Sequence, residues 1–115
     1  MIVNIAAFLV SPYRNQWLTI EHGELYVRKG HRILKDKRVS TFDLANVIVD
    51  PRYRGQKIFT SLLDSLEQEL TDYKIEAIYV ENIQELQLLP FLEKRGYEYD
   101  QRTADNCLYK IVTKG

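Results

Sequence analysis

The sequence has little of what builds disulfide, zinc or membrane-spanning structures. Its 115 residues include one cysteine, Cys107, which excludes an internal disulfide and a cysteine-rich zinc site. No run approaches the roughly 20 apolar residues that a spanning helix needs, and the apolar Met1–Val10 has no basic segment before it. We therefore expect a cytoplasmic protein without a membrane anchor, in which Met1–Val10 is a buried first element; a secretory signal is the less favoured alternative.

Net charge is also missing. The chain has 16 Lys and Arg against 16 Asp and Glu, and its pI is about 6.7. Non-specific nucleic-acid binding relies on a positive field that gathers phosphates, so nucleic acid is not an expected partner. A hydrophobic share of 45% with no repeat or Gly/Ser linker fits one domain with a real core. We expect a single domain over residues 1–115.

The first part of the chain is typical of a β-hairpin. Trp17–Ile20 and Leu25–Val27 are rich in strand-forming residues, and His22 and Gly23 between them are suited to a turn. Lys29-Gly30 has the composition of a second turn. The charged run that follows, residues 35–38, is expected to be a solvated loop or strand end.

The middle of the chain predicts a strand–helix–strand unit. Val39–Val49 ends in a continuous apolar run, which is typical of a strand buried on both faces. Apolar residues one, three and four apart then predict an amphipathic helix over 55–71. Ile75–Val80 is β-branched and aromatic and predicts a strand. Two strands joined by a helix in this way are expected to lie parallel.

The last third predicts a helix and two closing strands. Gln84–Arg95 has leucines at near-helical spacing, and Pro90 inside it is expected to kink or restart the helix before Gly96 ends it. Residues 97–99 and 107–112 then have strand composition. The whole pattern predicts an α/β (α+β) fold whose mixed, mainly antiparallel sheet contains one central parallel pair and has flanking helices.

The segment between the first parallel strand and its helix has the composition of an anion site. The first N–H groups of a helix have no intrahelical partner and carry the positive end of its dipole, so they can bind phosphate oxygens. Gly55 would let a ligand approach that backbone, and Arg52, Arg54 and Lys57 add positive charge. Cations at a helix start oppose the dipole, which favours a bound anion over the alternative of solvated surface charge.

This segment resembles a known phosphate-binding motif. It lacks the GxxxxGK[ST] pattern of nucleotide triphosphatases and the three glycines of the dinucleotide fingerprint. With Arg52, Gly55 and Lys57 it resembles the motif of the GNAT superfamily of N-acetyltransferases, in which Arg or Gln is followed after two residues by Gly and, after one more, by Gly or Ala. Residues 49–51, 62–63 and 91–97 are similar to family segments, so that the resemblance covers residues 42–99.

The resemblance implies an N-acetyltransferase that carries an acetyl group from acetyl-CoA to an amine of a small molecule or a protein. A homodimer remains open. In the family, backbone groups of the strand before the loop contact the pantetheine arm and the thioester, and the loop contacts the pyrophosphate. The cofactor-binding residues implied here are Val47, Ile48, Val49, Arg52, Arg54, Gly55, Gln56, Lys57, Ile58 and Asn82.

Catalytic roles are less directly indicated. Glu81 follows the second parallel strand, at the sheet edge where open α/β sheets bind ligands, and could accept the proton of the amine. Asn82 beside it could instead cap the next helix. The tyrosine that often protonates the departing thiolate in the family falls on Leu92, which has no proton to donate. Candidates for that role are Tyr97, and also Tyr79, Tyr99 and Cys107.

Two other functions stay open on these residues. Leu92 and Lys57 depart from the family pattern, and this leaves room for an inactive GNAT-fold module that binds CoA or a protein. A small adaptor that binds a partner through its sheet is the second alternative. Asp43 and Asn46, on the strand before the loop, are weaker candidates for positioning an acceptor or a water.

Overall fold

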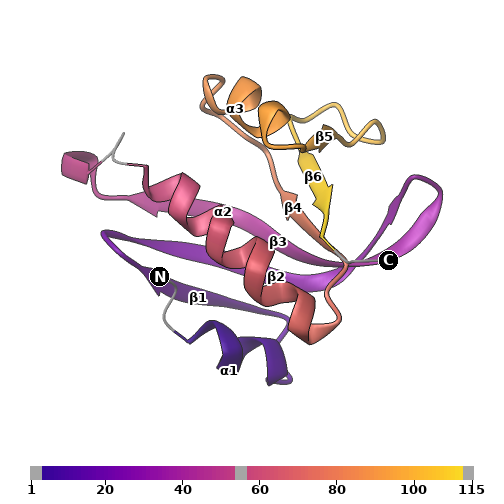
Figure 1. Cartoon of the computed structure of the whole chain (residues 1–115), viewed down its shortest axis with the longest axis horizontal. Coiled ribbons are helices and arrows are strands. Elements are labelled where there is room, and N and C mark those ends of the chain that lie inside the picture. The colour runs from indigo at the N-terminus through magenta and orange to yellow at the C-terminus, as the bar shows by residue number, and fades with distance from the viewer. Residues whose placement is uncertain (1–3, 54–56, 113–115) are drawn as a thin grey trace.

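Six strands form one mixed sheet in the computed structural model, which describes residues 4–53 and 57–112. The strand order is β1-β2-β3-β4-β6-β5, and Figure 1 shows how helices lie across this sheet. The elements are α1 (Ile5–Val10), β1 (Asn15–Ile20), β2 (Gly23–Leu34), β3 (Lys37–Val49), η1 (Pro51–Tyr53), α2 (Ile58–Glu69), η2 (Leu70–Tyr73), β4 (Ala77–Val80), α3 (Leu88–Lys94), β5 (Glu98–Tyr99) and β6 (Leu108–Ile111).

The predicted sheet topology is confirmed. All neighbouring strands pair antiparallel except β3 and β4, which are parallel and are joined through α2. The parallel ladder is short, because only Thr41–Leu44 and Ala77–Val80 pair. The fold is therefore the mixed, mainly antiparallel sheet with one central parallel pair that the sequence predicts.

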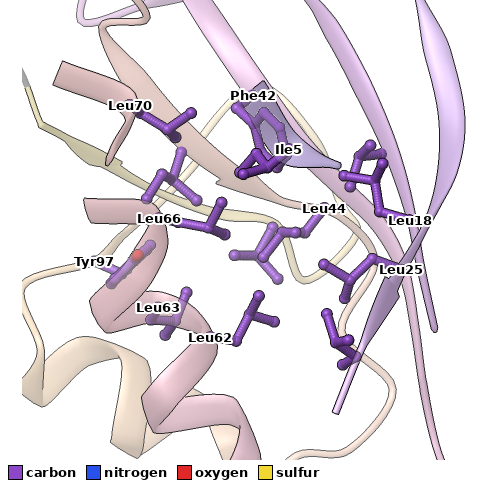
Figure 2. Close-up of a cluster of buried hydrophobic side chains, with 14 of the residues drawn as sticks. Ile5, Leu18, Leu25, Phe42, Leu44, Leu62, Leu63, Leu66, Leu70 and Tyr97 are labelled. Carbon is purple, nitrogen blue, oxygen red and sulfur yellow. The ribbon is translucent and has the colours of Figure 1, made fainter. Parts of the chain in front are cut away.

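The hydrophobic core lies between this sheet and the helices. Figure 2 shows the leucine stripe of α2 facing sheet residues such as Leu25 and Phe42. In α1, Phe8 packs edge-on against Phe42, with ring centroids 6.1 Å apart. Leu92 brings α3 into the same cluster. All three helices thus cover one face, and within the described ranges no helix covers the other.

The two parallel strands separate directly after their last paired residues. On β3, Leu44 pairs with Val27 and Asn46 with Tyr26, so that Ala45 is an extra residue without a partner on β2. A bulge of this kind bends a strand and increases its twist. It falls just beyond Leu44, where pairing with β4 ends. The bulge therefore turns the last residues of β3 away from β4, a divergence visible in Figure 1.

The structure differs from the sequence predictions in the turn between β2 and β3 and in the burial of β3. The turn predicted at Lys29-Gly30 is wrong, because β2 runs through it and pairs Gly30 with Thr41. The chain turns instead in the charged run, at Lys35 and Asp36, which both have positive φ. The apolar end of β3 is not its doubly buried part, since Ile48 is 47% exposed. The four consecutive buried residues are those that pair with β4.

The predicted helices are shorter than expected. The helix predicted over 55–71 begins at Ile58, after residues that lie outside the described part of the chain, and passes into η2 at Leu70. The helix predicted over 84–95 begins only at Leu88. Pro90 therefore lies in its first turn, where an N–H has no intrahelical partner; of the two expected effects, the helix starts near Pro90, and residues 84–87 form no earlier helical turn. Gly96 follows the helix with φ +99°, as its predicted place at the helix end requires.

A network of charged groups ties α2 to α3 and β6. Glu67 accepts hydrogen bonds from Arg95 Nε at 2.8 Å, Tyr97 Oη at 2.9 Å and Lys110 Nζ at 3.1 Å. Burial alone would raise the pKa of Glu67, but these three donors outweigh it and hold the pKa below its ordinary value. The network thus contributes to stability through the ionised carboxylate.

We expect Gly23→Ala to destabilise the protein by about 1–3 kcal/mol, the usual cost of overpacking. A Cβ at Gly23 would lie 2.1 Å from the Ile48 carbonyl oxygen, so the start of β2 and the end of β3 would have to move apart. Gly30→Ala in the same strand is the matched control, because a Cβ there meets nothing within 4 Å. Urea unfolding compares the two, and equal stabilities would contradict the close packing at Gly23.

We expect Glu67→Gln to remove part of the acid sensitivity of the fold. Because the pKa of Glu67 is lower in the folded than in the unfolded state, its contribution is present above about pH 5 and is lost as the pH falls below about 4. The free energy of unfolding from pH 7 to 3 should therefore fall less steeply in the variant. Glu69→Gln, at an exposed position of α2, is the control, and an unchanged slope in Glu67→Gln would disprove the role of the network.

Candidate functional site

The divergence of β3 and β4 opens a cleft of about 520 Å³. One wall is the end of β3 from Leu44 to Val49, and the other is the end of β4 with the segment that leads into α3. Tyr53 of η1 and the first residues of α2 close the end at which the chain turns from strand to helix. A cleft of this volume is in the range of small-molecule and cofactor sites.

The cleft brings together most of the cofactor-binding residues predicted within the described ranges. Those that line it are Val47, Val49, Lys57, Ile58 and Asn82. Ile48 is on the same strand segment, but its side chain does not line the cleft and is 47% exposed. From Ala45 onward β3 has no described strand partner on its β4 side, so its peptide groups can bond an extended ligand.

The structure describes only part of the predicted phosphate-binding segment. Arg54, Gly55 and Gln56 lie outside the described residues. Arg52 does not line the cleft, because its side chain is 78% exposed and its Nη2 bonds Asp50 Oδ2 at 2.8 Å. Its expected contact with a cofactor therefore needs a reorientation of this side chain.

The start of α2 has the electrostatics of an anion site. Lys57 precedes the helix with φ 61° and makes no side-chain capping bond, and the first turn of α2 contains no acidic residue. Among the described residues, no acidic or capping side chain therefore neutralises the positive end of the helix dipole. This end of the helix faces the cleft through Lys57, Ile58 and Phe59.

Aromatic residues that the sequence analysis did not assign to the site form its apolar wall. Phe59 of α2 and Phe91 of α3 meet edge-on at 6.1 Å, and both line the cleft. Tyr53 also lines it, and its ring stacks on His22 with centroids 3.5 Å apart. The helical spacing of Phe59 is that of a core position, and no sequence signal distinguishes a core face from a cleft wall.

A second cavity of about 570 Å³ lies on the sheet face that no described helix covers. Tyr79, Cys107 and Arg32 line it together with the loop that follows β5. Glu81 and Asn82 line both cavities. These two residues therefore stand at the junction, where β3 and β4 diverge.

Asn82 has a strained backbone at this junction. Its φ is 46°, in the left-handed region, and its N–H donates to Cys107 Sγ at 3.3 Å. The alternative prediction that it caps the next helix is wrong, since α3 begins at Leu88 after Gln87. Its side chain instead accepts a hydrogen bond from Gln84 Nε2 at 2.9 Å.

Glu81 belongs to a group of four charged side chains. Arg28 Nη1 and Arg32 Nη2 donate to its Oε1 at 2.5 and 2.7 Å. Arg32 Nη2 also bonds Asp43 Oδ2 at 3.0 Å. Asp43, a weaker candidate of the sequence analysis, therefore reaches the site through arginines that the sequence analysis did not select.

The structure does not bring Tyr97 to either cavity. Its side chain is 3% exposed and lies in the core, where its hydroxyl donates to Glu67. Burial and the nearby Glu67 carboxylate raise the pKa of Tyr97. The expectation that Tyr97 protonates a leaving group is therefore wrong. Its hydroxyl points to Glu67 of α2 and not to a cavity.

Of the other proposed proton donors, two lie in the second cavity. The Tyr79 hydroxyl donates to Asp100 Oδ2 at 2.5 Å. Burial is the main cause that raises the pKa of Tyr79, and this hydrogen bond raises it further. Cys107 is buried beside it. Tyr99 lines neither cavity, and Leu92, at the position of the family's tyrosine, is fully buried.

Within residues 4–53 and 57–112, no group of three or more His, Cys, Asp or Glu is arranged to hold a metal ion. None of the helices in these ranges has the length and apolar character needed to cross a bilayer.

The family of the chain is indicated by a match to the model of the acetyltransferase (GNAT) domain over residues 13–107. No curated protein sequence matches the chain. The matched region includes β1 to β5 and both walls of the cleft, and it ends directly before β6.

Similar solved structures have the same fold at low sequence identity. The toxin AtaT complexed with acetyl-methionyl-tRNAfMet matches with a TM-score of 0.63 at 15% identity, covering 77% of this chain and 61% of that one. An AtaT mutant bound to acetyl-CoA and the C-terminus of the antitoxin AtaR matches at 0.58 and 15%, covering 78% and 58%. The ribosomal-protein-S18-alanine N-acetyltransferase of Escherichia coli matches at 0.56 and 16%, covering 96% and 76%. The chain thus spans less than two thirds of the AtaT chains.

Proposed function

Because the chain belongs to the GNAT acetyltransferase family, we propose that it transfers an acetyl group from acetyl-CoA to an amine. The observation that carries this proposal is the cleft between the diverging ends of β3 and β4. It joins three features that the reaction needs: a strand edge for an extended cofactor arm, a helix start for phosphates, and a carboxylate at the far end.

In this proposal acetyl-CoA lies along β3 with its pyrophosphate at the start of α2. The peptide groups from Ala45 to Val49 would bond the amides of the pantetheine arm, a role that does not depend on side chains. The first N–H groups of α2 and the Lys57 ammonium would bind the phosphates. Phe59 and Phe91 would exclude water from the arm.

The chemical step needs a base near the thioester. The amine nitrogen forms a bond to the acetyl carbon, the C–S bond breaks, and the sulfur takes the electron pair as a thiolate. Glu81 is proposed to accept the proton that the amine loses. With Leu92 buried and Tyr97 bonded to Glu67, we propose that this same proton, or one from water, then passes to the thiolate.

The acceptor is proposed to reach Glu81 from the second cavity. That cavity opens on the opposite face of the sheet and shares Glu81 and Asn82 with the cleft, so an amine there would meet the thioester from the other side. Its volume of about 570 Å³ fits a small-molecule amine or the end of a protein chain. A balanced charge of 16 against 16 gives no general attraction to nucleic acid, although one structure of AtaT contains a tRNA.

We expect the protein to bind acetyl-CoA, and Lys57→Glu to weaken this binding about tenfold or more through loss of one charge-assisted contact. Titration calorimetry measures the affinity. Lys74→Glu is the matched control, because Lys74 is also an exposed lysine with positive φ beside a helix, at the other end of the α2–η2 segment. Equal affinities of the two variants would contradict phosphate binding at the start of α2.

We expect wild-type protein to release CoA from acetyl-CoA in the presence of an amine, and Glu81→Gln to lower kcat about 100-fold, the usual contribution of a general base. A thiol assay with a polyamine, an aminoglycoside, a nucleotide amine, and peptides with a free N-terminus or lysine covers the open acceptor classes. Binding of acetyl-CoA without release of CoA in any of these reactions would instead favour the inactive module.

A further inference from the structure

We propose that Arg28, Arg32 and Asp43 are positioning residues, which fix the Glu81 carboxylate at the junction of the two cavities. This inference rests on the proposed role of Glu81 as the base. The four side chains come from three adjacent strands: Arg28 and Arg32 from β2, Asp43 from β3, and Glu81 from the end of β4.

The burial of Asp43 does not by itself stabilise the fold. It is 2% exposed, and a buried carboxylate is destabilising unless charged donors compensate for its lost hydration. An apolar side chain would serve a central strand at least as well. Its partners are the two arginines: Arg32 Nη2 lies 3.0 Å and Arg28 Nη1 3.8 Å from Oδ2. Asp43 thus holds the two guanidinium groups that contact Glu81.

Arg32 reaches this group from some distance along the sheet. Its cross-strand partner is Val39, whereas Asp43 pairs with Arg28. Its side chain therefore lies along the open face, and its guanidinium stacks on the Tyr79 ring at 3.8 Å from the centroid. Tyr79 is itself fixed by the hydrogen bond of its hydroxyl to Asp100. The Arg32 guanidinium is consequently held by the Tyr79 ring against one of its faces and by a hydrogen bond to Asp43.

The two bonds to Glu81 are arranged differently from those in the other carboxylate network of this fold. At Glu67, Oε1 accepts from Arg95 and Lys110, and Oε2 accepts from Arg95 and Tyr97, so both oxygens are occupied. At Glu81, both arginines bond Oε1. The hydrogen bonds within the described residues thus leave Glu81 Oε2 to accept a proton.

The backbone of Glu81 is held as well. Its N–H donates to the Leu44 carbonyl at 3.0 Å, which continues the parallel ladder by one bond beyond its last residue pair. The main chain and one carboxylate oxygen are therefore both fixed. A base held in one orientation reacts without first losing rotational freedom, and a displacement of about 1 Å can cost up to a hundredfold in rate.

The test compares two arginines that each bridge two carboxylates. Arg32 bridges Asp43 and Glu81 on the open face, and Arg95 bridges Asp64 and Glu67 on the helix-covered face. For Arg32→Gln we expect kcat to fall about tenfold or more, with KM for acetyl-CoA changed by less than about twofold. Asp43→Asn should act in the same direction. Arg95→Gln should lower the melting temperature but leave kcat unchanged.

A folded Arg32→Gln protein with wild-type kcat would overturn the proposal, and so would an equal fall of kcat in Arg95→Gln. A second readout does not depend on turnover: the carboxyl ¹³C resonance of Glu81 by NMR, assigned through its loss in Glu81→Gln. We expect Arg32→Gln and Asp43→Asn, but not Arg95→Gln, to move it. If wild-type protein acetylates none of the amines, the proposed function fails, and this resonance alone decides whether the arginines hold Glu81.

Discussion

The short parallel pairing of β3 and β4 is the constraint on which the rest of the structure depends. Four residues of each strand pair, and the bulge at Ala45 then turns β3 away. A longer ladder would close the cleft and bury Glu81 under a continuous sheet. A shorter one would remove main-chain hydrogen bonds that join the two halves of the sheet. The number of paired residues thus sets both the cohesion of the sheet and the opening of the site.

The two faces of the sheet have different tasks. The helix-covered face contains the large apolar core, and its carboxylate Glu67 has donors on both oxygens. The open face has a small apolar cluster and the charged group around Asp43 and Glu81. Charge on the first face connects elements, whereas charge on the second converges on the point where the two cavities meet. This contrast is the physical basis for assigning a chemical role to Glu81 and a structural one to Glu67.

Periodicity was sufficient for the parts of the fold that local spacing determines. The leucine stripe of α2 and the parallel order of β3 and β4 were both predicted from it. The turn at Lys29-Gly30 was wrong because Gly30 is accommodated within a long hairpin, whose pairing along its whole length overrides the local composition. The length of the predicted helix over 84–95 was wrong because Pro90 is compatible with a first turn and not only with an interruption.

The site could be predicted where it depends on the backbone and less well where it depends on distant side chains. Glu81 follows from the position of a strand end in a parallel pair, and the resemblance to the family implied Val47 and Val49. The contacts of Arg28 and Arg32 with Glu81 span 53 and 49 residues along the chain, and no spacing rule connects such positions. Tyr97 was misplaced for the same reason. It directly precedes the edge strand β5, but the partner of its hydroxyl is Glu67 on α2, 30 residues earlier in the chain.

The architecture also has a consequence for the order in which the chain folds. The β1–β2–β3 meander is built from consecutive strands with tight turns, whereas pairing of β3 with β4 must close a connection of more than 30 residues. Local contacts form faster because less loop entropy is lost, so we expect the meander to form before the C-terminal half docks. The cleft lies along the junction of β3 and β4, which joins the two halves. A ligand that spans it therefore contacts both halves and slows their separation, so that occupancy of the site protects the chain against local unfolding and proteolysis.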